Sequence, residues 1–408
     1  MVGHMDNVVV VGAGLAGLRA AEALRGGGFD GRIQMVGEEA HRPYDRPPLS
    51  KKLLGGEWEA DRVVLRKADQ LDALQLEWVL SRRAIALDVD AREVELDGGD
   101  RLGYDGLVLA VGSTPRRLPT ADLDGLFVLR TLDDALALRR AFEAAPRRVV
   151  VIGAGFIGAE VAATARGRGL DVTVLEALPT PLVRGLGPAM GEACGALLRA
   201  GGIDLRCGVS VGALESDGSG RVTGVRLADD TAIDADVVVV GIGVTPDVAW
   251  LDGSGLALAD GIVCDATLAA GPPGVVAAGD CVRWPHPRYA GLLRLEHWTN
   301  AAEQGAHAGR TLLALASGGR GEPYAPVPFF WSDQFDARIQ LVGHAGRDDE
   351  VHVVHGSVDE GRFVTLYGRE GQLTAALGVS LPKLLMPYRR LLAAGASLAE
   401  AMTAARAV

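Results

Sequence analysis

Two glycine-rich segments contain the residues whose types and spacing say most about chemistry. In each, four β-branched residues precede a G-x-G-x-x-G pattern and an alanine-rich helical stretch follows it. The first glycine of this pattern permits a tight turn, the second lets the backbone approach a pyrophosphate, and the third lets the helix pack against the strand. Two copies in one chain predict two dinucleotide sites, with Gly12, Gly14 and Gly17 in the first and Gly153, Gly155 and Gly158 in the second.

The helix start after each pattern forms the second part of a predicted site. Its N–H groups have no partner within the helix and carry a partial positive charge, so they favour phosphate oxygens. The residues whose backbone N–H groups lie at this helix start are Leu15 and Ala16 in the first copy and Ile157 in the second. We therefore include these three residues among the candidate cofactor contacts.

An acidic residue follows the next predicted strand in both copies. Glu38 comes directly after the segment 32–37, and Glu176 comes directly after the segment 171–175. A carboxylate at this position accepts hydrogen bonds from ribose hydroxyls. Glu176 would also repel a 2′-phosphate, so it predicts a preference for NADH over NADPH. The alternative for either residue is a solvated strand end.

Length, composition and charge limit the classes of protein to consider. A chain of 408 residues is long enough for two or three domains. Its formal net charge of −11 argues against nucleic acid as a partner. No apolar run approaches the roughly 20 residues that span a bilayer, and no signal peptide is recognisable. We expect a cytoplasmic protein without a membrane or nucleic-acid partner.

The cysteines predict no metal centre. The four residues, at 194, 207, 264 and 281, form neither C-x-x-C nor C-x-x-x-x-C, so we expect reduced thiols and no zinc site or iron–sulfur cluster. The segment 38–60 contains no cysteine at all. The histidines are scattered and form no metal-binding or nucleophile motif.

The first half of the chain predicts two α/β units. Strand, helix and strand follow one another up to residue 37, and a loop at 41–51 contains three prolines that should exclude a helix before Leu49. Short strands are expected over about 76–111. A second α/β unit runs from about 117 to 241 and closes with the buried-type strand 237–243.

The second half changes in character near residue 328. Before it, the sequence predicts a strand at 274–280 and a helix over about 298–317. After it, the segments 329–342, 350–358 and 362–379 have the pattern of strands in an antiparallel meander, followed by a helical tail.

With these residues in view, the chain resembles the FAD-dependent NADH:ferredoxin reductases of bacterial oxygenase systems, which serve Rieske dioxygenases or cytochromes P450. This group belongs to the glutathione-reductase-like flavoprotein superfamily. The resemblance covers essentially the whole chain and rests on the two glycine patterns together with Pro43–Lys51, Leu109–Arg116, Ala278–Asp280 and Phe330–Gln334.

The resemblance implies the fold class and its domains. We expect an α/β protein with two Rossmann-like dinucleotide-binding domains and a C-terminal α+β domain that contains an antiparallel sheet. The FAD-binding domain would comprise 1–112 and 244–327. The NADH-binding domain would comprise 113–243, and the C-terminal domain 328–408.

The resemblance also implies where FAD binds. The first glycine copy would hold its pyrophosphate, Glu38 its adenosine ribose and Asp280 its ribityl chain, while Lys51 would lie near the flavin and stabilise its reduced form. An N-cap role for Asp280, an ordinary strand position for Ala84 and core packing for Trp298 stay open as alternatives. The implied FAD contacts outside the first glycine copy are Glu38, Arg46, Lys51, Ala84, Ala110, Arg130, Gly279, Asp280 and Trp298.

For NADH, the resemblance implies the second glycine copy, with Glu176 at the adenosine ribose and Arg184 near the adenine. Glu160, expected on the first turn of its helix, would pair with Lys51 beside the nicotinamide. A hydride would pass from NADH to FAD, and single electrons would then leave for a [2Fe–2S] ferredoxin. Trp331 would lie between flavin and ferredoxin, with core packing as its alternative; for Arg184 the alternative is an ordinary exposed arginine.

Other functions remain possible at this stage. An NADH:rubredoxin reductase, an NADH oxidase and a flavoprotein similar to apoptosis-inducing factor would share most of these motifs. Disulfide reduction is not expected, because the related disulfide reductases place C-x-x-x-x-C where this chain has no cysteine.

Overall fold

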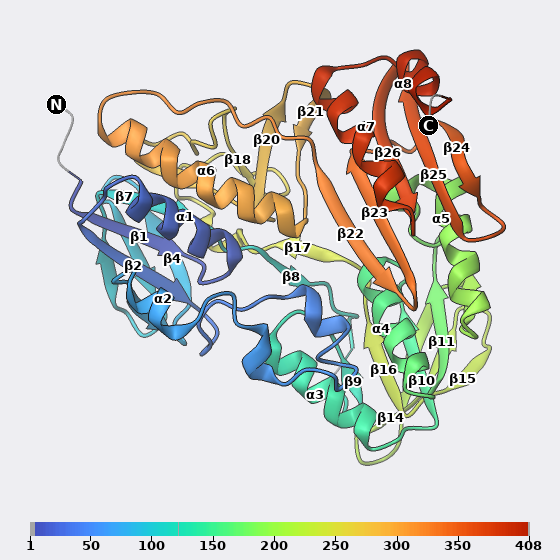
Figure 1. Cartoon of the computed structure of the whole chain (residues 1–408). Helices are drawn as coiled ribbons and strands as arrows, with labels where there is room; N and C mark the ends of the chain where they lie inside the picture. Colours follow the sequence, from blue (N-terminus) through green and yellow to red (C-terminus); the bar gives the residue numbers. More distant parts are fainter. Residues whose placement is uncertain (1–4, 121, 407–408) are drawn as a thin grey trace. The chain divides into compact units, whose positions relative to one another are not determined.

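The computed structural model describes residues 5–120 and 122–406, and these divide into two compact units (Figure 1). The first unit comprises Met1–Asp45, Val63–Thr114 and Thr245–Pro326, and the second comprises Arg46–Arg62, Pro115–Val244 and Val327–Val408. The ends of the predicted domains at 1–4 and 407–408 lie outside the described residues.

A five-stranded parallel sheet forms the centre of the first unit. Its order is β19-β7-β1-β2-β3, with β1 at Asn7–Val11, β2 at Arg32–Gly37, β3 at Glu77–Leu80, β7 at Gly106–Leu109 and β19 at Val275–Ala277. The central strand β1 is buried because its valines face helices and strands on both sides. The predicted strand–helix–strand start of the chain is confirmed.

Two helices, α1 (Leu15–Gly26) and α6 (Trp298–Ala316), lie side by side in this unit (Figure 1). Their approach depends on small residues. A Cβ on Gly305 would lie 2.2 Å from the carbonyl oxygen of Ala16, and a Cβ on Gly309 would lie 2.7 Å from that of Ala20. The close contact fixes α6 against the first glycine loop.

Smaller elements complete the first unit. These include the antiparallel sheet of β4 (Ala84–Asp88), β5 (Glu93–Leu96) and β6 (Arg101–Gly103), the sheet of β18 (Ile262–Val263), β20 (Val282–His286) and β21 (Tyr289–Leu293), helix α2 (Ala68–Asp72) and the 3₁₀ turn η3 (Ala249–Leu251). Strands β8 (Ser113–Pro115) and β17 (Val244–Pro246) lie where the chain passes from one unit's range to the other's.

The second unit repeats the same βαβ pattern. Its parallel sheet has the order β12-β11-β10-β16-β9, with β9 at Leu126–Phe127, β10 at Arg148–Ile152, β11 at Asp171–Glu176, β12 at Asp204–Cys207 and β16 at Val237–Val240. All four residues of β16 are buried, as predicted for a strand covered on both faces. The helices are α3 (Leu132–Glu143), α4 (Phe156–Gly167) and α5 (Val183–Ala200), and a small antiparallel sheet contains β13 (Val211–Ser216), β14 (Val222–Leu227) and β15 (Ala232–Asp234).

The C-terminal part of this unit is a five-stranded antiparallel sheet with two helices. The strands are β22 (Phe329–Gln334), β23 (Ala337–Gly343), β24 (Glu350–Ser357), β25 (Arg362–Arg369) and β26 (Gln372–Val379), and the helices are α7 (Pro382–Ala394) and α8 (Leu398–Ala405).

The predicted meander is wrong, because the strand order is β22-β23-β26-β25-β24. The segments 329–342 and 362–379 each fold into a hairpin, with turns at positive-φ residues such as Phe335, Glu370 and Gly371. Strand β26 is almost wholly buried and lies inside the sheet, while β24 contains no buried residue and lies at its edge. The order of the strands in the sheet therefore follows how deeply each strand is buried and not their order in the sequence.

The proline-rich loop also differs from the prediction. A 3₁₀ turn, η1, covers Pro47–Ser50, so helical structure does begin before Leu49. The prolines occupy its first positions, where a missing N–H costs nothing. A second 3₁₀ turn, η2, covers Ala60–Val63. Among the described residues, no helix is long and apolar enough to cross a membrane.

Candidate functional site

The first glycine loop connects β1 to α1, and at two of its glycines the neighbouring backbone leaves no room for a side chain. Gly12 has φ +117°, and a Cβ there would lie 2.1 Å from the carbonyl oxygen of Ala110. A Cβ on Gly17 would lie 2.0 Å from the carbonyl oxygen of Gly12. Gly14 is different, because it has an ordinary extended conformation and a Cβ there would meet no atom within 4 Å.

The second loop, between β10 and α4, has the same division of roles. Gly153 has φ +103°, and a Cβ there would lie 2.4 Å from the carbonyl oxygen of Gly241. A Cβ on Gly158 would lie 2.1 Å from the carbonyl oxygen of Gly153. A Cβ on Gly155 would meet nothing within 4 Å. Packing within the chain thus explains the outer glycines but not the middle one, which fits a surface that a pyrophosphate approaches.

The helices that follow these loops begin without side-chain caps. At α1 and α4 no described side chain accepts a bond at the N-cap, and neither first turn contains an acidic residue. Helix α3 shows the contrast, because Thr131 and Asp134 form a capping box there. Uncapped N–H groups beside an open glycine suit a bound phosphate. The residues present fit dinucleotides at both loops.

The two acidic residues at the strand ends differ in how firmly they are held. Glu176 accepts hydrogen bonds from the backbone N–H of Ala154, at 2.7 Å, and of Leu178, at 2.9 Å. Its carboxylate is therefore fixed against the second glycine loop. The Glu38 side chain is 60% exposed, and its nearest cation is Arg83 at 3.9 Å.

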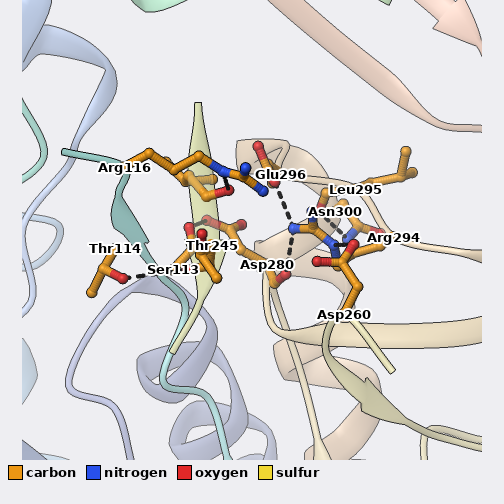
Figure 2. A network of polar contacts seen from close by, with 11 residues as sticks. Ser113, Thr114, Arg116, Thr245, Asp260, Asp280, Arg294, Leu295, Glu296 and Asn300 are labelled. Atoms are coloured by element: carbon orange, nitrogen blue, oxygen red, sulfur yellow. Dashed lines mark hydrogen bonds and ion pairs between the residues drawn. The ribbon is translucent and has the colours of Figure 1, made fainter. Parts of the chain in front are cut away.

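Asp280 lies in the turn between β19 and β20 of the first unit (Figure 2). Its carboxylate accepts a hydrogen bond from the Ser113 hydroxyl at 3.2 Å, and Arg294 donates to its backbone oxygen at 3.3 Å. Figure 2 shows that Arg294 also contacts Asp260 and Glu296. The N-cap alternative for Asp280 is wrong, because a strand rather than a helix follows the turn.

Residues around Asp280 complete this region of the first unit. Gly279 has φ +88°, and its N–H donates to the side chain of the buried Gln304 at 2.8 Å. Trp298 is the first residue of α6, and its indole N–H donates to Asp45 at 2.6 Å. Gln304 was not among the predicted site residues, although an amide inside an apolar helix face is a recognisable signal.

The remaining predicted FAD contacts are divided between the units. Ala84 at the start of β4 and Ala110 after β7 are buried in the first unit. Arg46 and Arg130 belong to the second unit, where the Arg46 guanidinium donates to the backbone oxygen of Arg130 at 2.6 Å.

A buried ion pair is the most distinctive feature of the second unit. The Lys51 ammonium lies 2.6 Å from the Glu160 carboxylate, whose side chain is only 4% exposed. Glu160 lies at the start of the second turn of α4, not on its first turn as predicted. Lys51 directly follows the turn η1 of the proline-rich loop, and Glu160 follows the second glycine loop. The ion pair therefore joins these two motifs.

Two hydroxyl groups complete the environment of Glu160. Ser50 donates to Oε2 at 2.6 Å, and Ser332 donates to Oε1 at 2.7 Å. Gln334 donates in turn to the Ser332 hydroxyl at 3.3 Å. A buried carboxylate is tolerated when it is paired and hydrogen-bonded in this way. The sequence analysis did not include Ser50, Ser332 or Gln334 among the site residues. For the last two a signal was available, because they lie on the same buried face of β22 as Phe330 although they are polar.

Trp331, Arg184 and Ile157 occupy more accessible positions. Trp331 is partly buried on β22, where it stacks against Phe329 at 6.2 Å between ring centres. Arg184 is exposed at the start of α5. Ile157 is 49% exposed in the first turn of α4, an unusual position for a large apolar side chain beside a glycine loop.

The cysteines take no part in either region. All four are free, and burial raises the pKa of the Cys194 and Cys281 thiols to about 12. Among the described residues, no group of histidine, cysteine or acidic side chains could hold a metal ion.

Comparisons with known proteins agree along nearly the whole chain. Residues 6–305 match the family described as pyridine nucleotide-disulphide oxidoreductase, and residues 329–408 match the reductase C-terminal family. Rhodocoxin reductase of Rhodococcus erythropolis is 39% identical over 95% of this chain and 89% of its own length. The ferredoxin–NAD(+) reductase component of the biphenyl dioxygenase system of Paraburkholderia xenovorans is 38% identical, with 89% and 86% covered.

A solved structure gives the same result. The crystal structure of the covalent putidaredoxin reductase–putidaredoxin complex matches with a TM-score of 0.90 and 34% identity, covering 96% of this chain and 94% of that one. The predicted fold class and the predicted resemblance are confirmed. The chain belongs to the pyridine nucleotide-disulphide oxidoreductase family, as a member with the reductase C-terminal domain.

Proposed function

We propose that this protein is an NADH-dependent ferredoxin reductase that supplies electrons to an oxygenase. The relative from Paraburkholderia xenovorans is the ferredoxin–NAD(+) reductase component of a dioxygenase system. The family matches extend over both glycine loops and the C-terminal sheet. The observation that carries the proposal is the pair of glycine loops whose middle positions face open space, since each fits one dinucleotide. When bound, FAD supplies a group that accepts a hydride and releases electrons singly.

For the first loop, we propose FAD as the ligand. The open backbone at Gly14 would admit the pyrophosphate, and the uncapped start of α1 would donate N–H groups to it. The Asp280 carboxylate, which Ser113 and the adjoining turn hold in place, would accept hydrogen bonds from the ribityl hydroxyls. Glu38 would accept from the adenosine ribose.

For the second loop, we propose NADH as the ligand. Gly155 and the start of α4 would hold the pyrophosphate. The Glu176 carboxylate is fixed by two backbone N–H groups, so it can accept from the ribose hydroxyls without moving. Because the same carboxylate repels a 2′-phosphate, this arrangement supports NADH rather than NADPH.

We propose that Lys51 and Glu160 act where the nicotinamide binds. Glu160 lies two residues beyond Gly158 on α4, close to the loop that would hold the pyrophosphate. Its carboxylate holds the Lys51 ammonium at 2.6 Å, so the position of this cation is fixed before the ligand arrives. A fixed cation costs no reorganisation during hydride transfer.

The family name includes disulfide reduction, but this chain lacks the means for it. No cysteine occurs in the segment 38–60, where related enzymes carry their redox pair. The four thiols that are present lie elsewhere and are unpaired. Unpaired thiols also support our proposal that the protein works in the cytoplasm, where thiols are kept reduced.

The test uses the purified protein loaded with FAD. Anaerobic NADH should bleach the flavin absorbance, and NADPH should do so at a much lower rate. Cytochrome c should then be reduced quickly only when a [2Fe–2S] ferredoxin is added. Equal rates without ferredoxin would contradict the proposal and favour an oxidase, and a protein that never binds FAD would end it.

A further inference from the structure

The carboxylate of Glu160 receives donors from two parts of the second unit that are distant in sequence. Ser50 and Lys51, from the proline-rich loop, both donate to Oε2. The other oxygen, Oε1, accepts from Ser332 of the C-terminal sheet at 2.7 Å. The orientation of the carboxylate plane therefore depends on the proline-rich loop and on the C-terminal sheet together.

The Ser332 hydroxyl is held so that its proton points toward Glu160. Gln334, two residues further along β22, donates to the Ser332 oxygen at 3.3 Å. A carboxylate can only accept and an amide N–H can only donate, so the hydroxyl gives its proton to Glu160 while its oxygen accepts from Gln334. Both side chains have no exposed surface, so water cannot replace either bond.

The side chain of Gln334 has an energetic cost to the fold. Its side-chain oxygen is buried and has no hydrogen-bond partner among the described residues. A buried polar atom without a partner destabilises a fold, and an apolar side chain of similar shape would avoid that cost. A glutamine at this position is therefore better explained by what its N–H group does for Ser332 than by packing.

We propose that Ser332, directed by Gln334, is a positioning residue that sets the Glu160 carboxylate and through it the Lys51 ammonium. The proposal rests on the proposed function, because it concerns hydride transfer from NADH at this ion pair. Loss of the Ser332 hydroxyl leaves Oε1 without its donor, so the carboxylate can rotate and the ammonium can move with it. Hydride transfer depends on close alignment of the reactants, so its rate falls while NADH affinity is little changed.

The experiment follows flavin reduction by NADH in FAD-loaded protein by stopped-flow absorbance. Ser332→Ala should reduce the limiting rate about tenfold, while the Kd for NADH, from the concentration dependence, changes by less than about twofold. Ser332→Thr keeps a hydroxyl and should recover most of the rate. Unfolding midpoints and FAD content are measured for every variant.

Gln334→Met separates positioning from stability. The fold should be at least as stable as the unchanged protein, since a buried amide with an unpaired oxygen is removed, and yet flavin reduction should be slower. The matched control is Thr365→Val, which removes a buried hydroxyl from the same sheet. This hydroxyl donates to the Met190 sulfur and not to Glu160. The rate of Thr365→Val should equal that of the unchanged protein.

Several results would overturn the inference. These are an unchanged rate in Ser332→Ala, a loss in Thr365→Val as large as that in Ser332→Ala, or an unchanged rate in Gln334→Met. If Ser332→Ala does not fold, Gln334→Met decides the question alone. If NADH fails to reduce the flavin of the unchanged protein, the proposed function fails instead.

Discussion

Replacing Gly155 with alanine should weaken NADH binding with only a small effect on the stability of the fold. The backbone at Gly155 has φ −78° and ψ −179°, which any residue adopts, and a new Cβ would meet no atom within 4 Å. Gly155 is the N-cap of α4, where alanine is less favourable than glycine, so the free energy of unfolding should fall by no more than about 1 kcal/mol. Any larger effect must come from a ligand that approaches this backbone.

The expected loss of affinity is at least tenfold, or about 1.4 kcal/mol, because the methyl group would occupy the space of the pyrophosphate. Gly158→Ala should behave in the opposite way. Its Cβ would lie 2.1 Å from the carbonyl oxygen of Gly153, so the helix start must shift, at a cost of about 1–3 kcal/mol in stability or more.

The assay combines calorimetric titration with NAD⁺, thermal unfolding and the visible absorbance of bound FAD. Gly167→Ala is the control, since it lies at the end of the same helix, in open space. It should bind NAD⁺ normally. The reasoning is refuted if Gly155→Ala binds NAD⁺ as tightly as the control does, or if it loses FAD while NAD⁺ binding persists.

Four further predictions concern the other site residues. Lys51→Ala should slow flavin reduction by NADH and lower the unfolding midpoint, because the buried Glu160 loses its counter-ion at a cost of about 3–5 kcal/mol. Unchanged stopped-flow rates would remove Lys51 from the site. Glu176→Ala combined with Ala177→Arg should let NADPH compete with NADH in steady-state kinetics, and unaltered cofactor preference would count against the ribose assignment. Asp280→Ala should release FAD on gel filtration, seen as loss of yellow colour. Iodoacetamide at pH 8 should modify only Cys207, the one partly exposed thiol among four; more than one adduct by mass spectrometry would contradict the burial of the rest.

The parallel sheets were predictable because their signals are local. A β-branched run, a glycine turn and a small-residue helix start follow one another directly in both copies, and the strands and helices lie where this order places them. The C-terminal sheet was predictable only as strands. The order of its strands depends on which strand faces apolar neighbours on both sides. No short stretch of the sequence indicates that β23 lies beside β26.

The candidate site shows the same limit at the level of side chains. Lys51 and Glu160 could be paired in advance because the resemblance links their motifs, and the structure brings them to 2.6 Å. Ser332 could not be placed beside them, since nothing in its own segment points to Glu160, which lies 172 residues earlier in the chain. Its signal was indirect, namely a hydroxyl at a strand position where the neighbours on the same face are buried.

Strand β22 gives this signal a physical meaning. Side chains alternate between the two faces of a strand, so Trp331 and Ser332 point in opposite directions although they are consecutive. Ser332 faces Glu160 and is fully buried, whereas Trp331, predicted to lie on the side where electrons leave, is partly exposed. One strand would thus join the residue that fixes the buried ion pair to the aromatic group on the acceptor side, and a shift of this strand by one residue would disturb both.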